Sequence, residues 1–282
     1  MLILKTIEQV RAQIEKGVAN GLKIGFVPTM GALHQGHISL ITKAKKENDL
    51  VVASIFVNPT QFNDPTDLIN YPKTPEQDHS ILEKNGCDIL FEPTADEIYD
   101  DSYDPPAFDF GILDKTMEGA QRPGHFKGVA MVVYRLFQII PAHRAYFGEK
   151  DYQQLAIIRK MADDQKLPIQ IIACPTIREA DGLAMSSRNI RLTAQERKLA
   201  SVIFESLIEC NNLINSVGLS DAKKTISSKI EATGVFKIEY VEIADAQTLQ
   251  PIERADIQQQ MRVFIAAKAS KTRLIDNMGL RF

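Results

Sequence analysis

Cysteine is scarce in this chain of 282 residues, which contains only Cys87, Cys174 and Cys210. These cysteines are odd in number, far apart in the sequence, and none of them belongs to a C-x-x-C pair. Disulfide-stabilised secreted domains and structural zinc sites both depend on recurrent, closely spaced cysteines. The sequence therefore argues against both classes, and we expect a cytoplasmic protein.

Long apolar runs and an excess of basic charge are also missing. The longest apolar stretch, "GVAMVVYRLFQII", is interrupted by Arg135 and falls short of the roughly 20 residues that span a bilayer. The first residues become charged too soon for a secretory signal. The formal net charge is -3 and the basic residues are scattered. We therefore expect neither a membrane nor a nucleic acid as partner.

Apolar runs and helical patterns alternate through the first two-thirds of the chain. The continuous β-branched run "LVVASIFVN" (50–58) is typical of a central parallel strand that is covered on both faces. Strand followed by helix, repeated several times, requires crossover connections. This pattern predicts an α/β fold, a Rossmann-like open parallel sheet with helices on both faces.

The elements expected in this first part share the same signals, namely apolar runs for strands and capped periodic segments for helices. Strands are expected at 22–28, 50–58, 87–93, 144–149 and 168–175, and helices at 36–47, 75–86 (with Thr74 as N-cap), 125–139 and 151–165.

The pattern changes after Pro175, where a polar, aperiodic segment begins. A long helix opened by the capping box Thr193-x-x-Glu196 follows it, then a second helix at about 221–232. Alternating strands are expected at 236–245 and 261–269. We therefore expect two domains, a Rossmann-like domain at 1–176 and a smaller α+β domain at 177–282.

The segment "PTMGALHQGH" (28–37) leaves the first predicted strand and enters a helix. Ligands of open α/β sheets bind beyond the carboxyl ends of the strands, and a helix start attracts anions. The dinucleotide pattern G-x-G-x-x-G fails, since Ala32 and Leu33 follow Gly31. The P-loop pattern fails because His37 stands in place of its lysine and Ile38 in place of its hydroxyl residue.

What remains is an H-x-G-H motif formed by His34, Gly36 and His37. An imidazole can donate a hydrogen bond to a phosphate oxygen, and Gly36 would let a nucleotide approach the backbone. Taken alone, the motif leaves open that these are incidental histidines in a surface loop. A metal site is not favoured, because no Cys, Asp or Glu nearby completes a ligand set.

H-x-G-H after a first strand resembles the signature of the nucleotidylyltransferase superfamily, which includes class I aminoacyl-tRNA synthetases. The longer string, with four later blocks in the same order, resembles the pantoate–β-alanine ligase (pantothenate synthetase) family. These blocks are "FVNPTQF" (56–62), "RPGHFKGVAMVV" (122–133), "FGEKDYQQL" (147–155) and "DGLAMSSRN" (181–189). Small departures, such as Gln35 in place of Glu and Lys73 in place of Arg, bear on details of the substrate loop.

The resemblance implies an ATP-dependent condensation of (R)-pantoate with β-alanine to pantothenate, AMP and pyrophosphate. The implied intermediate is pantoyl adenylate, and the product is a precursor of coenzyme A. ATP is then a substrate, with Mg²⁺ bound mainly through its phosphates and no dedicated protein ligands. The family resemblance also implies a homodimer.

The resemblance also assigns roles to residues within the matching blocks. Catalytic roles fall to His34, His37, Lys150 and Arg188. ATP contacts are expected from Met30, Gly31, Ala32, Leu33, His34, Gln35, Gly36, His37, Gly148, Glu149, Lys150, Asp151, Ile177, Met185, Ser186, Ser187 and Arg188. Substrate contacts are expected from Pro28, Met30, Asn58, Gln61 and Gln154. The roles of Asp78 and His125 stay open.

Other functions predict different residues. An adenylyltransferase acting on a phosphate-bearing substrate should carry Arg or Lys where Gln61 and Gln154 stand. A tRNA synthetase would need a further RNA-binding domain. A regulatory module that binds nucleotide without turnover should have lost some of His37, Lys150 or Arg188, and all three are present.

Overall fold

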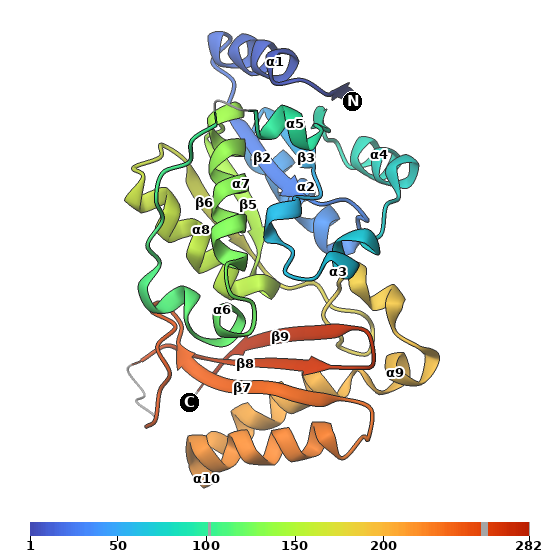
Figure 1. Ribbon diagram of the computed structural model, residues 1–282, viewed down its shortest axis with the longest axis vertical. Coiled ribbons are helices and arrows are strands. Elements are labelled where there is room, and N and C mark those ends of the chain that lie inside the picture. The colour runs from blue at the N-terminus through green and yellow to red at the C-terminus, as the bar shows by residue number, and fades with distance from the viewer. Residues whose placement is uncertain (101–102, 255–258, 282) are drawn as a thin grey trace. The chain divides into compact units, whose positions relative to one another are not determined.

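The computed structural model describes residues 1–100, 103–254 and 259–281, shown in Figure 1. It divides into two compact units. The first comprises Met1–Glu149 and Gln154–Pro175, and the second comprises Lys150–Gln153 and Thr176–Phe282. The chain thus enters the second unit at Lys150, directly after "FGE", and returns to the first unit at Gln154.

The first unit is built on a parallel sheet of six strands within the described residues, in the order β1-β4-β3-β2-β5-β6. The strands are β1 (Leu2–Leu4), β2 (Ile24–Thr29), β3 (Leu50–Ile55), β4 (Ile89–Phe91), β5 (Arg144–Gly148) and β6 (Gln170–Cys174). The predicted parallel sheet is therefore confirmed. The details differ in two ways: β1 was not predicted, and β3, β4 and β6 are shorter than the strands predicted at 50–58, 87–93 and 168–175.

The strand order reverses at β2. From β2 the chain moves to β3 and β4 on one side, whereas β5 and β6 lie on the other side of β2. Such a switch point leaves a crevice at the carboxyl ends of the neighbouring strands, where α/β proteins bind ligands. The segments that follow β2, β3 and β5 therefore meet at one edge of the sheet.

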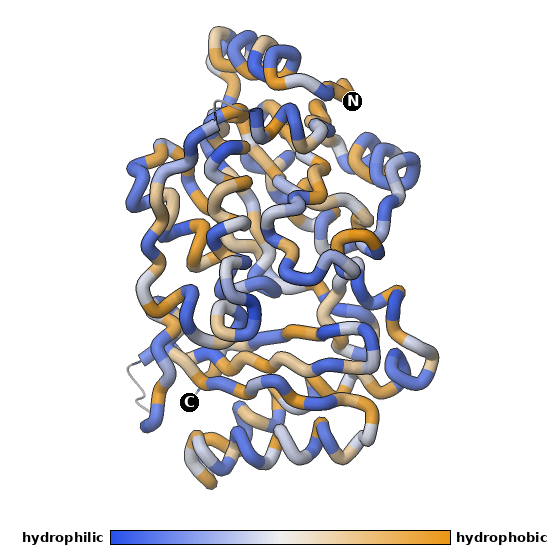
Figure 2. Tube along the Cα trace, in the orientation of Figure 1, coloured by the Kyte–Doolittle hydropathy of each residue, from blue (hydrophilic) through white to orange (hydrophobic). Residues whose placement is uncertain are grey.

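Helices connect these strands, and those predicted at 36–47, 125–139 and 151–165 are present to within a residue. The helices are α1 (Ile7–Ala19), α2 (Gln35–Glu47), α3 (Pro65–Ile69), α4 (Pro75–Lys84), α5 (Ala95–Ile98), α6 (Met117–Gln121), α7 (His125–Ile139) and α8 (Tyr152–Asp164), with 3-10 turns η1 (Pro59–Gln61), η2 (Gly111–Asp114) and η3 (Glu149–Asp151). Figure 2 shows hydrophobic and hydrophilic residues alternating around α1, which buries Val10, Ile14 and Gly17 at helical spacing.

Both faces of the sheet are covered, as the sequence predicts. On one face, Leu40 and Ile41 of α2 pack with Val27 and Val51 of the strands in a single buried cluster. The opposite face holds α7, whose Phe137 meets Phe26 edge-on at 6.3 Å between ring centroids. Successive residues of a strand point to opposite faces, so Phe26 and Val27 serve the two layers in turn.

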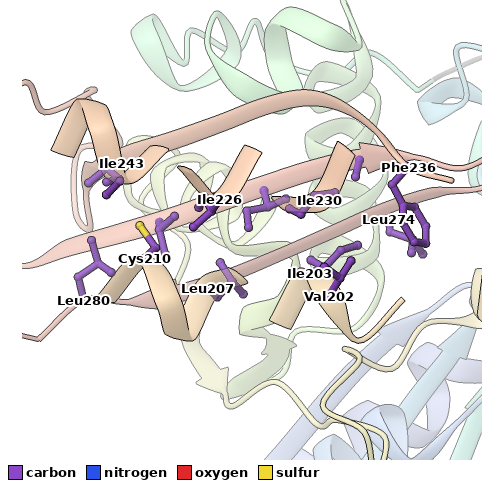
Figure 3. Close-up of a cluster of buried hydrophobic side chains, with 14 of the residues drawn as sticks. Val202, Ile203, Leu207, Cys210, Ile226, Ile230, Phe236, Ile243, Leu274 and Leu280 are labelled. Atoms are coloured by element: carbon purple, nitrogen blue, oxygen red, sulfur yellow. The ribbon is translucent and has the colours of Figure 1, made fainter. Parts of the chain in front are cut away.

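The second unit is a smaller α+β unit, also as predicted. Its elements are η4 (Ser187–Arg191), α9 (Ala194–Leu199), α10 (Val202–Glu231), β7 (Lys237–Asp245), β8 (Met261–Lys268) and β9 (Arg273–Gly279). The strands form an antiparallel sheet in the order β7-β8-β9. Strand β9 was not predicted. The long helix expected from Thr193 is divided in two, because α9 ends at Leu199 and α10 begins at Val202. Figure 3 shows α10 side chains such as Leu207 and Ile226 in the core of this unit, among strand residues such as Ile243 and Leu274.

Local signals account for the ends of these helices. Thr193 and Glu196 form the predicted capping box, each side chain accepting a hydrogen bond from the other's backbone N–H. Gly218 interrupts α10 with φ 81° and ψ 169°, so the predicted helix at 221–232 is its second half. Thr74 stands at the N-cap of α4, but its hydroxyl makes no capping bond and donates to Asp78 instead.

None of the helices in the described part of the chain combines the length and hydropathy that crossing a membrane would need.

Candidate active site

The H-x-G-H motif caps the start of α2. Nδ1 of His34 accepts a hydrogen bond from the backbone N–H of Gly36 at 3.1 Å, and the backbone N–H of His34 donates to Nδ1 of His37 at 3.2 Å. The two ring centroids are 4.1 Å apart. A Cβ at Gly36 would lie 2.8 Å from Cε1 of His34. Glycine is therefore needed here to make room for the capping imidazole.

These hydrogen bonds also assign the tautomers of the two histidines. A ring nitrogen that accepts a hydrogen bond carries no proton, so each neutral imidazole has its hydrogen on Nε2. His34 and His37 are half-buried and each offers one N–H donor. Two neutral donors, together with the backbone N–H groups of a helix start, suit a phosphate group.

The loop before the motif is held by a buried carboxylate from α4. Asp78, only 1% exposed, accepts hydrogen bonds from the backbone N–H groups of Ala32 at 2.9 Å and Leu33 at 2.8 Å. The loop needs this support because Gly31 and Ala32 have φ of 79° and 50°, and a left-handed conformation costs energy for alanine. Asp78, whose role the sequence leaves open, thus fixes the path of the loop.

Asn58 is the N-cap of η1 and Gln61 is its last residue. This turn follows β3 at the same sheet edge. Asn58 is fully buried, and its Nδ2 donates to Oε1 of Gln61 and to the carbonyl of Gly128, both at 3.2 Å. Nε2 of Gln61 lies 3.0 Å from Sδ of Met30. The structure therefore brings three predicted substrate contacts, Met30, Asn58 and Gln61, into one cluster.

His125 and Arg122 hold this turn from the side of α7. Nδ1 of His125 lies 2.8 Å from the carbonyl oxygen of Gln61, and its Nε2 lies 3.0 Å from Nη1 of Arg122. A guanidinium only donates, so Nε2 of His125 accepts and its Nδ1–H donates to Gln61. At Gly128 a Cβ would meet the carbonyl oxygen of Thr60 at 2.4 Å. The "RPGHF" block thus positions the backbone of Gln61.

The remaining predicted residues of the first unit occupy the same edge of the sheet. Gly148 ends β5 beside β2, Glu149 begins η3, and Gln154 lies in the first turn of α8 with a half-buried side chain. Pro28 is paired with Ser54 near the end of β2, and Gln35 is exposed at the start of α2.

The second unit holds the other group of predicted residues. Lys150 and Ser186 line one small cavity, together with Asn189 and Asp276. The carbonyl of Lys150 accepts a hydrogen bond from Nδ2 of Asn277 at 2.8 Å. Oδ1 of Asn189 is buried without a hydrogen-bond partner within the described structure. Polar, cationic and acidic residues therefore line this cavity, and Nζ of Lys150 lies 3.9 Å from Oδ1 of Asp151.

Neighbouring contacts hold the segment that carries these residues. Ser186 caps η4 by accepting from the backbone N–H of Arg188 at 3.3 Å, and the backbone N–H of Met185 donates to Ile177 at 3.0 Å. Ser187 and Arg188 are half-buried, whereas Asp151 is exposed. Each predicted residue of this group is therefore placed within the second unit, and the histidine and glutamine residues within the first.

The sequence predicts no role for Tyr99, Asp78 or Arg122. Their contacts join segments that are 41 to 61 residues apart, as for Tyr99 with Asn58 and Arg122 with Gln61. No local pattern signals such contacts. For Arg122, the one signal in the sequence was its place in the "RPGHF" block that resembles the family.

A parallel sheet whose switch point carries a histidine-capped helix defines a nucleotide-binding α/β protein of the H-x-G-H type. Residues 2–279 match the pantoate–β-alanine ligase family. The pantothenate synthetase of Christiangramia forsetii is 47% identical over 268 residues, which cover 95% of each chain. The chain belongs to the pantoate–β-alanine ligase family, and is thus an ATP-dependent ligase that condenses pantoate with β-alanine.

Solved structures agree with this assignment. The crystal structure of pantothenate synthetase from Thermus thermophilus has a TM-score of 0.91 and 39% identity, covering 99% of both chains. The Francisella tularensis pantoate–β-alanine ligase, crystallised with β-γ ATP and β-alanine, has a TM-score of 0.84 and 40% identity, covering 99% of this chain and 97% of that one. The predicted family, fold class and reaction are confirmed.

Proposed function

We propose that this chain makes pantothenate in two chemical steps. The carboxylate of pantoate first attacks the α-phosphorus of ATP, which gives pantoyl adenylate and releases pyrophosphate. The amine of β-alanine then attacks the acyl carbon and displaces AMP. The observation that carries this proposal is the H-x-G-H cap, which holds two Nε2–H donors at the sheet edge that also carries Gln61.

In the first step His37, which the family resemblance implies as a proton donor, acts together with His34 mainly as an electrostatic stabiliser. Phosphoryl transfer needs in-line positioning and donors for the charge that spreads over the phosphate oxygens. Neutral Nε2–H groups supply those donors while their Nδ1 atoms stay occupied by the backbone. Met30 to Gln35 form the wall of this phosphate site.

Gln61 and Gln154 bind pantoate. A side-chain amide can hydrogen-bond a carboxylate and hydroxyl groups without the full charge that would weaken a carboxylate nucleophile. Gln61, fixed by Asn58, binds the carboxylate beside Met30. Gln154, on the first turn of α8, binds elsewhere on the same small acid.

The residues of the second unit bind the rest of ATP. Lys150 and Arg188 neutralise the β- and γ-phosphates, and the hydroxyls of Ser186 and Ser187 donate to the pyrophosphate as it forms. Ile177 and Met185 contact the adenosine. Mg²⁺ binds mainly through ATP oxygens and keeps several waters. A cytoplasmic homodimer completes the proposal.

The decisive experiment is an assay of AMP formation from ATP, Mg²⁺, pantoate and β-alanine, with each acid left out in turn. We expect AMP, and continued release of pyrophosphate over many turnovers, only with both acids. Pantoate alone should support exchange of labelled pyrophosphate into ATP, because the adenylate step is reversible. Release of ADP, or exchange that does not depend on pantoate, would contradict the proposal. Size-exclusion chromatography with light scattering tests the homodimer.

A further inference from the structure

The side chain of Asn58 has only one possible orientation. Its Oδ1 accepts three hydrogen bonds, from the backbone N–H of Thr60 at 3.2 Å, the hydroxyl of Thr60 at 3.0 Å and the hydroxyl of Tyr99 at 2.8 Å. Burial raises the pKa of Tyr99 to about 12, so its hydroxyl keeps its proton. The backbone N–H can only donate, and this alone requires an oxygen at that position.

This orientation determines that of Gln61. With Oδ1 facing Thr60 and Tyr99, the amide nitrogen of Asn58 faces Oε1 of Gln61 and the carbonyl of Gly128. An amide nitrogen donates and does not accept, so Gln61 must turn its oxygen toward Asn58. The amide nitrogen of Gln61 then faces the opposite side, where its contact is Sδ of Met30, a weak acceptor.

We propose that Tyr99 and Asn58 form a relay that fixes Gln61 as a hydrogen-bond donor toward the substrate, so that the site selects a carboxylate over an uncharged carboxamide. The proposal rests on the assignment of Gln61 to pantoate made above. A carboxylate only accepts hydrogen bonds, and it therefore matches the NH₂ group of Gln61. A carboxamide matches this donor only through its carbonyl oxygen, and a hydrogen bond to that neutral acceptor is weaker than one to a charged carboxylate.

In this relay Asn58 and Tyr99 act on the substrate through Gln61, and neither of them needs to touch it. A glutamine amide without such a constraint can rotate by half a turn and present either its oxygen or its nitrogen. Asn58 is fully buried, and both polar atoms of its side chain are hydrogen-bonded to protein groups. We therefore assign Asn58 and Tyr99 as positioning residues for Gln61, in place of the direct substrate contact expected for Asn58.

The test compares pantoate as substrate with its primary amide as competitive inhibitor. Tyr99→Phe removes one of the three donors to Oδ1 of Asn58 and should raise the KM for pantoate by about fivefold, the value of one hydrogen bond. The inhibition constant of the amide should change less. The preference for acid over amide, measured as the inhibition constant of the amide divided by the KM for pantoate, should therefore fall. The KM for ATP should not change, and this separates the relay from a general loss of structure.

Asn58→Asp is the sharper variant, because an aspartate accepts where Asn58 donates. Gln61 should turn its nitrogen toward the new carboxylate and its oxygen toward the substrate, so the acid-to-amide preference should fall by at least about 30-fold, near 2 kcal/mol. Thermal unfolding of both variants checks that they fold. If Asn58→Asp does not fold, Tyr99→Phe still decides the question.

Tyr103→Phe is the matched control. The Tyr103 hydroxyl donates to the carbonyl of Met131 at 3.0 Å, and its ring lies 5.8 Å from that of Tyr99 between centroids. This variant loses a hydroxyl in the same region and should leave the preference for acid over amide unchanged. A preference that stays within twofold of wild type in Tyr99→Phe, or that falls equally in Tyr103→Phe, would overturn the relay. Wild-type protein that forms no AMP from pantoate would instead contradict the proposed function.

Discussion

The carboxylate of Asp78 accepts the backbone N–H of Leu33 at 2.8 Å, across 45 positions of the sequence. The same carboxylate accepts the N–H of Ala32 at 2.9 Å, so its two oxygens hold two consecutive amides of the loop that leads to His34. Loop, carboxylate and histidine cap therefore form one connected assembly. The loop that leads to the two histidines is thus held by a carboxylate from a different helix, α4.

Asp78→Asn should damage both stability and turnover. An asparagine can accept from one of the two amides but points its NH₂ group at the other, which leaves a buried donor unpaired at a cost of about 1–3 kcal/mol. We expect a lower unfolding temperature and a kcat reduced by about 10- to 100-fold as the loop loses its geometry. Steady-state kinetics and thermal unfolding measure both effects. Asp96→Asn, an exposed aspartate in α5, should match wild type in both measurements.

Substitutions of His37 can separate the helix cap from phosphate stabilisation. Oδ1 of an asparagine can take the place of Nδ1 and accept the N–H of His34, but it offers no donor at the position of Nε2. His37→Asn should thus unfold near the wild-type temperature while its pyrophosphate exchange falls about 10²- to 10³-fold, as for other lost charge-stabilising donors. His37→Ala should lose both properties. Wild-type exchange in His37→Asn would mean that the imidazole acts only as a cap.

The sheet was predictable because its signals are local. The β-branched run at 50–58 and the capped helices each carry their own pattern, and the crossover rule makes the sheet parallel without giving the order of its strands. The missed strand β9 buries Asp276 and Asn277, each 4% exposed, and such residues break the apolar pattern of a strand. They are tolerated because Asp276 pairs with both Nη atoms of Arg178, 98 positions away, a contact that no local pattern signals.

In the candidate active site too, some residues carry a local sequence signal and others are recognised only by contacts with distant segments. The H-x-G-H motif and the family blocks give the residues that would meet ATP and pantoate, since these lie at the ends of predicted strands. The residues that hold them, Asp78 and Tyr99, come from other segments and have ordinary sequence surroundings. Resemblance could name Gln61, but only coordinates show that its amide oxygen faces Asn58 and its amide nitrogen faces Met30.

Gln61→Glu should weaken pantoate binding by charge repulsion. A glutamate oxygen can still accept from Asn58, so the turn should keep its structure while a carboxylate replaces the donor beside Met30. Two like charges disfavour each other, and we expect the KM for pantoate to rise about 100-fold, with the KM for ATP little changed. Isothermal titration with pantoate checks this directly. Unaltered affinity would show that Gln61 does not face the carboxylate.

Glu196 provides a pH-dependent test of the second unit. Its carboxylate accepts from the hydroxyl of Ser270 at 2.6 Å, from the N–H of Ser270 at 3.0 Å and from the N–H of Thr193 at 2.7 Å. The Ser270 hydroxyl, with these backbone donors, lowers the pKa of Glu196 from 4.5 to about 2. Because the folded-state pKa lies below the unfolded-state value, ionised Glu196 stabilises the fold at neutral pH. This stabilisation begins to fade below about pH 5 and is lost as the pH falls through about 2.

Glu196→Gln removes this charge but keeps the shape of the side chain. At pH 7 we expect it to lower the free energy of unfolding by about 2 kcal/mol, the scale of hydrogen bonds to a charged group. The difference from wild type should be constant from pH 8 to 5 and should shrink by more than half at pH 3, because Glu196 takes up a proton in unfolded wild type on that path while the folded state still holds it ionised, and the glutamine variant takes up none. Urea unfolding across this range measures it, with the exposed Glu15→Gln in α1 as control. A difference that persists unchanged to pH 3 would show that hydrogen bonding to neutral Glu196, and not its charge, joins the start of α9 to Ser270.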